Sequence, residues 1–165
     1  MTKEEIIKYL NLSPHPEGGW YRQVYHSKTT IPSSLDQQRY FYTSIYFLLD
    51  YSSPSHFHRL KHDEIWYYHG GTPIDIHIIS STGTYSKIVL GNDLSQGEHL
   101  QYMVPAGSIF GSEVNTHDNY SLVSCAVSPG FDYQDFEIFT QQQLLAKYPK
   151  YHNIIKKLAY KTLPN

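Results

Sequence analysis

The 165-residue chain has few of the features that cross-link a protein or bind a charged polymer. It has one cysteine, Cys125, so it forms no internal disulfide. That cysteine lies in the alternating apolar run S-L-V-S-C-A-V, which favours a buried, unreactive thiol over a nucleophile. Lys and Arg are scattered without a basic run, and the formal net charge is −2. This composition argues against nucleic acid or an anionic membrane as a main partner.

Long apolar segments and two common catalytic motifs are also missing. No window approaches the roughly 18 consecutive apolar residues that a membrane span needs, and the N-terminus M-T-K-E-E-I-I-K-Y-L lacks the apolar core of a signal peptide. Gly70-Gly71 lacks the strand–loop–helix context of a phosphate loop. Ser112 and Ser124 have no His-Asp arrangement beside them. We therefore expect a soluble cytoplasmic protein that is neither a P-loop enzyme nor a serine hydrolase.

Tyrosine and histidine are abundant, with 16 and 10 residues. Tyrosine favours strands and combines an apolar ring with a polar hydroxyl. The abundance therefore indicates half-exposed strand faces, a pocket lined with rings and hydroxyls, or both.

Turn signals divide most of the chain into short strands. They are expected at 20–24, 40–49, 56–59, 64–69, 74–79, 85–89, 100–104, 108–111, 120–128 and 134–139. Segments 11–19 and 31–38 are expected to be loops, and the capping boxes Thr2-x-x-Glu5 and Thr140-x-x-Gln143 predict a short helix at each end. Many short, evenly spaced strands are typical of a sandwich or barrel. We expect one domain over residues 1–165, with a barrel at about 12–140 and a helical tail at 141–165.

The stretch S-H-F-H-R-L-K-H-D-E-I-W-Y-Y-H-G at 55–70 concentrates groups that bind metals or move protons. On a strand His56 and His58 face the same side, and Glu64 lies on a second strand beyond a short turn. If the turn brings them together, they form a facial triad for a divalent metal such as Fe(II). In the alternative arrangement His56 points to solvent and only His58 lies inside.

Several segments carry a resemblance to a known family. Asp50, His56, His58, Glu64 and Gly71 stand close to the spacing of the first cupin signature, and Pro105 and Gly107 match the second. Together with H-P-E-G-G-W-Y-R (15–22), F-H-R-L-K-H-D-E-I-W (57–66), V-P-A-G (104–107) and S-P-G-F-D-Y-Q-D-F-E (128–137), they resemble the fifth cupin group, a subfamily of small proteins without an assigned activity. The resemblance spans roughly residues 10–140.

The resemblance implies an all-β fold, the double-stranded β-helix or jelly-roll barrel of cupins, often as a homodimer through N-terminal strands. It also implies a distant likeness to dTDP-sugar epimerases, which use a His base and a Tyr acid. Phe110 stands where the cupin signature has its fourth metal ligand, and the subfamily keeps His58 but not His56. We therefore expect no cofactor, and a divalent metal at His56, His58 and Glu64 is the alternative.

The predicted active site lies inside the barrel, with His58 and Glu64 as catalytic residues. The ligand-binding residues are expected to be Tyr46, Lys61, Trp66, Tyr68, His77, Gln101 and Phe110. Glu64 is expected either to pair with Lys61 or Arg59, or to stay protonated as a hydrogen-bond donor. The acid could be Tyr68, Tyr102, Tyr120 or Tyr133.

Two further choices stay open at this level. The segment His15–Gly19 either sets a bend or brings Glu17 or Arg22 to the mouth of the pocket. The leading function is binding of a sugar-like or nucleotide-sugar-like small molecule, with isomerase or epimerase chemistry. The alternatives are a metal-dependent dioxygenase and a non-catalytic ligand-binding protein.

Overall fold

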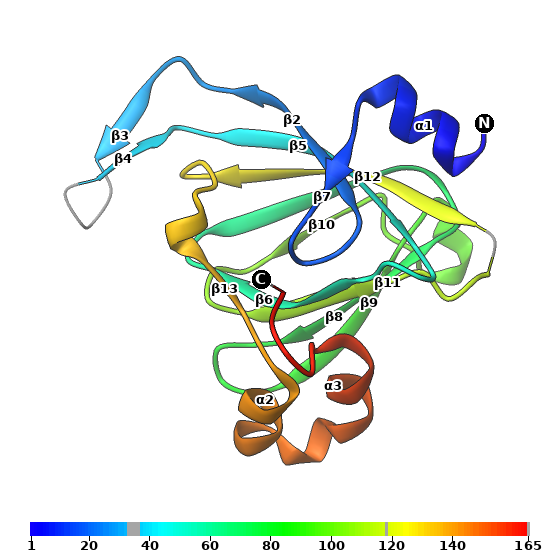
Figure 1. Ribbon diagram of the computed structural model, residues 1–165, viewed down its shortest axis with the longest axis vertical. Coiled ribbons are helices and arrows are strands. Elements are labelled where there is room, and N and C mark those ends of the chain that lie inside the picture. The colour runs from blue at the N-terminus through cyan, green and yellow to red at the C-terminus, as the bar shows by residue number, and fades with distance from the viewer. Residues whose placement is uncertain (33–36, 118, 165) are drawn as a thin grey trace.

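The computed structural model describes residues 1–32, 37–117 and 119–164, and most of the chain is β-strand (Figure 1). The strands are β1 (Ser13–Pro14), β2 (Trp20–His26), β3 (Thr30–Pro32), β4 (Gln38–Tyr40), β5 (Thr43–Asp50), β6 (Ser55–Leu60), β7 (Asp63–Gly71), β8 (Ile74–Ile79), β9 (Tyr85–Leu90), β10 (Gln101–Val104), β11 (Ile109–Glu113), β12 (Tyr120–Ser128) and β13 (Phe136–Ile138). The α-helices are α1 (Lys3–Leu10), α2 (Gln141–Lys147) and α3 (His152–Leu158), and three short 3₁₀ turns are η1 (Leu94–Gln96), η2 (Tyr133–Asp135) and η3 (Pro149–Tyr151).

Eleven of the described strands form two antiparallel sheets that face each other, and β3 and β4 form a third, two-stranded sheet. The larger has the order β1-β2-β5-β12-β7-β10, and the smaller has the order β13-β6-β11-β8-β9. Strand β12 lies inside the larger sheet and alternates strictly, so that Val123, Cys125 and Val127 are buried while their neighbours are only partly covered. Side chains of alternating positions point to opposite faces of a sheet, and this alternation directs the three residues into the interior.

The main core lies between the two sheets. Phe47, Trp66 and Val123 from the larger sheet pack in one cluster with Ile76 and Phe110 from the smaller sheet. Each of these side chains is at most 1% exposed. Burying a large apolar side chain stabilises the folded state by roughly 1.5–3 kcal/mol, so this cluster holds the sheets face to face.

Helices cover the outer faces of both sheets (Figure 1). Helix α1 packs Ile6 against Leu48 on the outside of the larger sheet. Helices α2 and α3 pack Leu144 and Ile155 against Phe57 on the outside of the smaller sheet. The molecule is therefore layered as helix, sheet, sheet and helices, with the barrel interior between the sheets.

The all-β prediction is confirmed, because the sheets form the jelly-roll arrangement expected of a double-stranded β-helix. Both capping boxes form: the Thr2 hydroxyl accepts from the Glu5 amide at 3.2 Å, and Thr140 accepts from Gln143 at 3.3 Å. The expected loop at 31–38 needs correction, since strands β3 and β4 pair at its two ends, while 33–36 lie outside the described residues.

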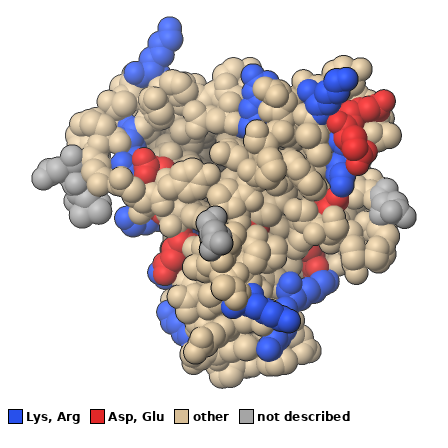
Figure 2. All heavy atoms as spheres, in the orientation of Figure 1, with Lys and Arg blue, Asp and Glu red and all other residues tan. Residues whose placement is uncertain are grey.

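The visible surface carries its charges in small, separate groups. Figure 2 shows mostly uncharged atoms on this face, with lysines and arginines dispersed among them rather than joined in one patch. In the described part of the chain, no helix has the length and apolar character needed to cross a bilayer.

Candidate functional site

A cavity of about 420 Å³ opens between the sheets. Strands β2, β5, β6, β7 and β12 and the segment before β13 form its walls. Its described lining residues are His15, Glu17, Tyr21, Gln23, Thr43, Ile45, Phe47, His58, Leu60, Glu64, Cys125, Val127, Phe131, Asp132 and Tyr133. A cavity of this size can hold one small organic molecule.

The loop before β2 inserts Glu17 into the cavity. His15 N–H donates to the Gly19 carbonyl at 3.0 Å, and Gly18 N–H donates to the His15 carbonyl at 3.0 Å, which closes a tight turn. Gly18 has φ +113°, and a Cβ there would lie 1.9 Å from the Pro54 carbonyl oxygen. Only glycine satisfies both conditions, so the H-P-E-G-G sequence directs the Glu17 side chain inward.

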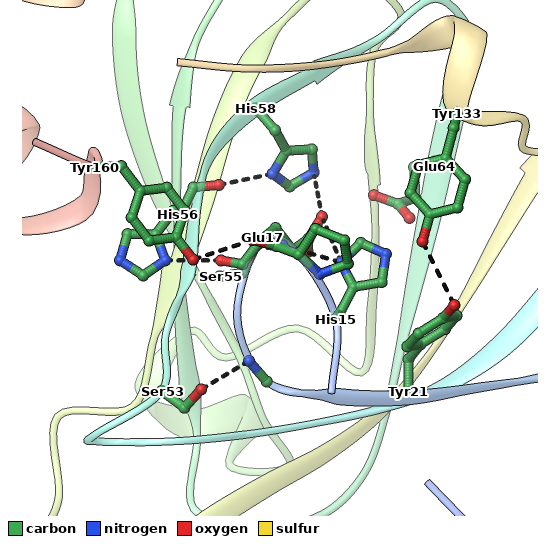
Figure 3. A network of polar contacts seen from close by, with 12 residues as sticks. His15, Glu17, Tyr21, Ser53, Ser55, His56, His58, Glu64, Tyr133 and Tyr160 are labelled. Atoms are coloured by element: carbon green, nitrogen blue, oxygen red, sulfur yellow. Dashed lines mark hydrogen bonds and ion pairs between the residues drawn. The ribbon is translucent and has the colours of Figure 1, made fainter. Parts of the chain in front are cut away.

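Glu17 and His58 form a buried pair at the centre of the site (Figure 3). Glu17 Oε2 lies 3.3 Å from His58 Nε2, and the other oxygen, Oε1, accepts a hydrogen bond from the Ser55 hydroxyl at 2.8 Å. Glu17 is 6% exposed and His58 is 2% exposed. His58 Nδ1 lies 2.8 Å from the His56 carbonyl oxygen, which can only accept, so Nδ1 carries a hydrogen and Nε2 faces Glu17.

Burial disfavours the charged form of both members of the pair. Burial raises the pKa of Glu17 well above its usual value, and repulsion from Glu64 raises it further. Burial also lowers the pKa of His58 to about 3. Both shifts disfavour the charged forms, so burial favours an uncharged carboxyl facing an uncharged imidazole. The pair thus brings two proton-binding groups into contact.

Two more titratable side chains face the same space. His15 Nδ1 lies 3.5 Å from Glu17 Oε2, and burial lowers the pKa of His15 to about 4. Glu64 accepts a hydrogen bond from Trp66 Nε1 at 3.0 Å, and burial raises the pKa of Glu64 to about 7. Figure 3 shows Glu64 on the side of the site away from His56, and Tyr133 lines the same cavity. The site therefore combines a neutral imidazole with a carboxyl that titrates near neutral pH.

Tyrosine hydroxyls and aromatic rings form the wall beside Glu64. Tyr21 and Tyr133 bring their hydroxyl oxygens within 3.4 Å of each other (Figure 3). Burial and the Tyr21 hydroxyl raise the pKa of Tyr133, so this phenol remains a proton donor. The Tyr133 ring packs edge-on to Phe131, with centroids 5.1 Å apart.

The predicted catalytic residues His58 and Glu64 both line the cavity. Trp66 and Phe110 lie beneath it in the core, where Phe110 packs 4.1 Å from the His58 ring centroid. Of the candidate tyrosines, Tyr133 lines the cavity, whereas the Tyr68 hydroxyl donates to the Gly71 carbonyl. Tyr120 points to the Met1 carbonyl, and Tyr102 packs against the core.

The structure places the other predicted ligand-binding residues elsewhere. Tyr46 packs in the cluster beneath α1, and Gln101 is exposed. Lys61 pairs with Asp135 at 3.1 Å, and Arg59 pairs with Glu137, so neither neutralises Glu64. The reason is alternation: the strand periodicity sends these side chains to the other face or to the rim.

The predicted metal ligands His56, His58 and Glu64 are not brought together. His56 stacks on Tyr160 with centroids 3.7 Å apart, and its Nδ1 donates to the Glu17 carbonyl at 2.7 Å. Both nitrogens of His58 already have partners, and Phe110 fills the position of a fourth ligand. The residues present therefore do not fit a metal at this position.

A different cluster has the donors for a divalent cation. Within residues 1–32, 37–117 and 119–164, Asp75, His77 and Glu113 are the one group of three whose ligand atoms all lie within 4.8 Å of one another. The cluster does not line the cavity. Lys87 lies 2.8 Å from Asp75, and Lys157 lies 2.5 Å from Glu113, so two ammonium groups already neutralise its carboxylates.

Several site residues were not predicted from the sequence, or only as an open alternative. The H-P-E-G-G segment was expected either to set a bend or to bring Glu17 or Arg22 to the mouth of the pocket. The structure brings Glu17 into the cavity. Arg22 points elsewhere and donates to the Leu10 carbonyl at 3.1 Å. His15, Tyr21 and Cys125 had no functional prediction. The adjacent glycines were the available signal, since two of them beside an acid indicate a close backbone approach.

Comparison with known proteins places this geometry in a family. The family model described as Cupin superfamily (DUF985) matches residues 4–139. The chain belongs to this cupin family. A hypothetical protein from Leishmania major has 46% identity and a TM-score of 0.92, with 98% of this chain and 100% of that chain covered. A protein from Shewanella oneidensis has 46% identity and a TM-score of 0.92, with 98% and 99% covered.

More distant cupins share the fold alone. Oxalate decarboxylase from Bacillus subtilis has 15% identity and a TM-score of 0.56, with 93% of this chain and 40% of that chain covered. No curated protein matches this cupin. The resemblance to cupins expected from residues 10–140 is therefore confirmed.

Proposed function

We propose that this cupin binds a small, unphosphorylated organic molecule in its barrel and moves a proton on it, in an isomerase- or epimerase-like reaction. The observation that carries the proposal is the buried contact between the Glu17 carboxyl and His58 Nε2, which lie 3.3 Å apart inside a cavity of about 420 Å³. A general base and acid must lie within hydrogen-bonding reach of the atoms they act on, and both groups face the cavity.

In this proposal, the ligand displaces Glu17 Oε2 from His58 Nε2, and this nitrogen then takes a proton from a carbon next to a carbonyl, which breaks the C–H bond and leaves an imidazolium beside Glu17. The Tyr133 hydroxyl returns a proton to the other face of the same carbon. The Gln23 amide donates a hydrogen bond to the carbonyl oxygen while negative charge develops on it. His58 then releases its extra proton to water, and the group that donated a proton regains one from water. The step needs no oxidant or reductant.

The lining favours a sugar-like ligand without phosphate groups over a nucleotide sugar. Aromatic rings stack on sugar rings, and the hydroxyls and the Gln23 amide can bind sugar hydroxyls. A pyrophosphate would need Lys or Arg, and none of the described lining residues is either.

The test is hydrogen–deuterium exchange at carbon. A panel of neutral aldoses, ketoses and hydroxycarbonyl compounds is incubated with the protein in deuterated water and followed by NMR, after ligands are selected by thermal shift. His58→Asn should slow exchange at least 100-fold, and Glu17→Gln should slow it comparably while the fold is kept. His99→Asn, an exposed histidine outside the cavity, is the matched control.

Three outcomes are informative. Loss of exchange in His58→Asn with retained ligand binding supports the proposal. Unchanged exchange removes His58 as the base. Stabilisation by a ligand without exchange in the unmodified protein identifies a non-catalytic ligand-binding protein instead.

We also propose that the protein works as a homodimer. The β3–β4 hairpin extends away from the sheets (Figure 1), and Tyr25, Tyr40, Phe41 and Tyr42 nearby are 40–64% exposed. Exposed aromatic side chains gathered in one region are typical of protein–protein contacts.

A further inference from the structure

The charge of the ligand follows from the charges of the cavity. Resting on the proposed function, we propose that the ligand carries an ammonium group that binds to Glu64, while its uncharged polar part lies between the aromatic wall and the Glu17–His58 pair. This assigns an amine-bearing polyol or sugar as the chemical class.

The cavity is lined by acids, without lysine or arginine. Glu17, Glu64 and Asp132 line it, and none of the described lining residues is Lys or Arg. Arg39 lies 2.7 Å from Asp135 and 3.8 Å from Asp132, and Lys61 lies 3.1 Å from Asp135, which leaves Glu64 without an ion pair among the described residues. A buried anion without a partner costs several kcal/mol, so the lining excludes carboxylate and phosphate ligands more strongly than neutral ones.

Glu64 is the group best placed to bind the ammonium. One oxygen, Oε2, accepts the Trp66 indole N–H at 3.0 Å, and within the described residues no donor reaches the other oxygen. The side chain is 8% exposed, so a charged partner meets this carboxyl in a medium of low dielectric. A charge-assisted hydrogen bond formed there is about twice as strong as a neutral one.

The aromatic wall provides the second element of an ammonium site. Tyr21, Phe47, Phe131 and Tyr133 all line the cavity with Glu64. A cation over a ring face within about 6 Å gains about 0.5–2 kcal/mol from the ring quadrupole. Because these rings and Glu64 line one cavity, an ammonium bound to the carboxyl meets an aromatic wall.

The experiment compares three polyols that share a six-carbon chain and differ in charge. N-methyl-D-glucamine is cationic, D-sorbitol is neutral and D-gluconate is anionic, and each is titrated into the full-length protein by calorimetry. We expect the amine to bind at least tenfold more tightly than sorbitol, and gluconate to show no binding. Glu64→Gln should reduce the tenfold preference to less than twofold. Glu137→Gln, a half-exposed acid outside the cavity, should leave it unchanged.

A second measurement uses the unmodified protein, so that it does not depend on the folding of a variant. The indole N–H of Trp66 donates to Glu64, whereas the second tryptophan, Trp20, packs near α1. N-methyl-D-glucamine should shift the NMR signal of the Trp66 indole N–H and leave that of Trp20 in place. Sorbitol should shift neither signal at the same concentration.

The results that would overturn the ammonium site differ from those that would overturn the proposed function. Equal binding of sorbitol, tighter binding of gluconate, or an amine preference that persists in Glu64→Gln each overturns the ammonium site. Failure of all three polyols to bind also overturns it. Exchange at carbon with neutral ligands would still support the proposed function in each of these cases.

Discussion

Glu64→Gln should make the protein more stable at alkaline pH. The glutamine keeps the shape of the protonated carboxyl, and its carbonyl oxygen can still accept from Trp66 Nε1, which now lies 3.0 Å from Glu64 Oε2. The variant therefore removes the ionisation of Glu64 and little else. The wild-type protein, in contrast, must ionise a buried carboxyl as the pH rises.

The magnitude follows from the pKa of Glu64 in the two states. Burial raises the pKa of this carboxyl from 4.5 to about 7. Between these pH values the folded state holds a proton that the unfolded state has lost, so stability falls as pH rises through this window. Since one pKa unit corresponds to about 1.4 kcal/mol, the full destabilisation above pH 7 is about 3 kcal/mol.

The assay is urea denaturation of wild type and Glu64→Gln at several pH values between 5 and 8.5. The variant should gain stability over wild type progressively, and reach about 3 kcal/mol at the highest pH. Glu137→Gln lies at an exposed carboxyl and should follow the wild-type curve. The histidines titrate in both proteins, so their effects cancel in the difference. Parallel curves for wild type and Glu64→Gln would show that Glu64 ionises normally, and would refute the buried-carboxyl argument.

Three other predictions follow from the geometry. Gly18→Ala should destabilise the protein by at least about 2 kcal/mol in the same urea assay, because the new Cβ would lie 1.9 Å from the Pro54 carbonyl oxygen. Gly97 also has a positive φ of +78° but open space around it, so Gly97→Ala should cost only about 1 kcal/mol. Equal losses of stability in the two variants would refute the contact with Pro54. Lys157→Ala frees a Glu113 oxygen, so Zn²⁺ should bind at least tenfold more tightly in calorimetry, and His77→Ala should abolish this gain; a Zn²⁺ affinity unchanged by Lys157→Ala would refute the competition. Phe41→Ser should lower the dimer fraction in light scattering, since the exposed ring loses apolar contact area; a monomeric wild type would refute the dimer.

The strands and helices could be predicted from local sequence patterns. Each capping box uses two residues three apart, so it is complete within one turn of helix, and both form as predicted. The alternation of β12 likewise depends only on neighbouring residues, which is why the strand at 120–128 has the predicted bounds. The short pairing of β3 and β4 was missed because the polar segment between them carries no apolar alternation.

The contacts within the site could not be predicted as well, because the residues that make them are far apart in the chain. Glu17 and His58 are separated by about 40 positions and meet at 3.3 Å only because the loop at Gly18 packs against Pro54. The same contact helps to explain why His56, His58 and Glu64 do not form a metal site. It gives His58 Nε2 a carboxyl partner, while Tyr160 from the C-terminal segment stacks on His56 and holds it apart from Glu64.

The sequence by itself determined the β-rich architecture, the helices at its two ends and the placement of His58 and Glu64 on two consecutive strands, which face a common interior from opposite sheets. Period-two alternation and helix capping depend only on neighbouring residues, so the same local pattern favours the same local structure wherever it occurs in the chain. The tertiary structure alone decided which proton-carrying groups meet, and how burial changes their pKa values. Desolvation depends on every segment that closes over the cavity, so no local pattern contains it.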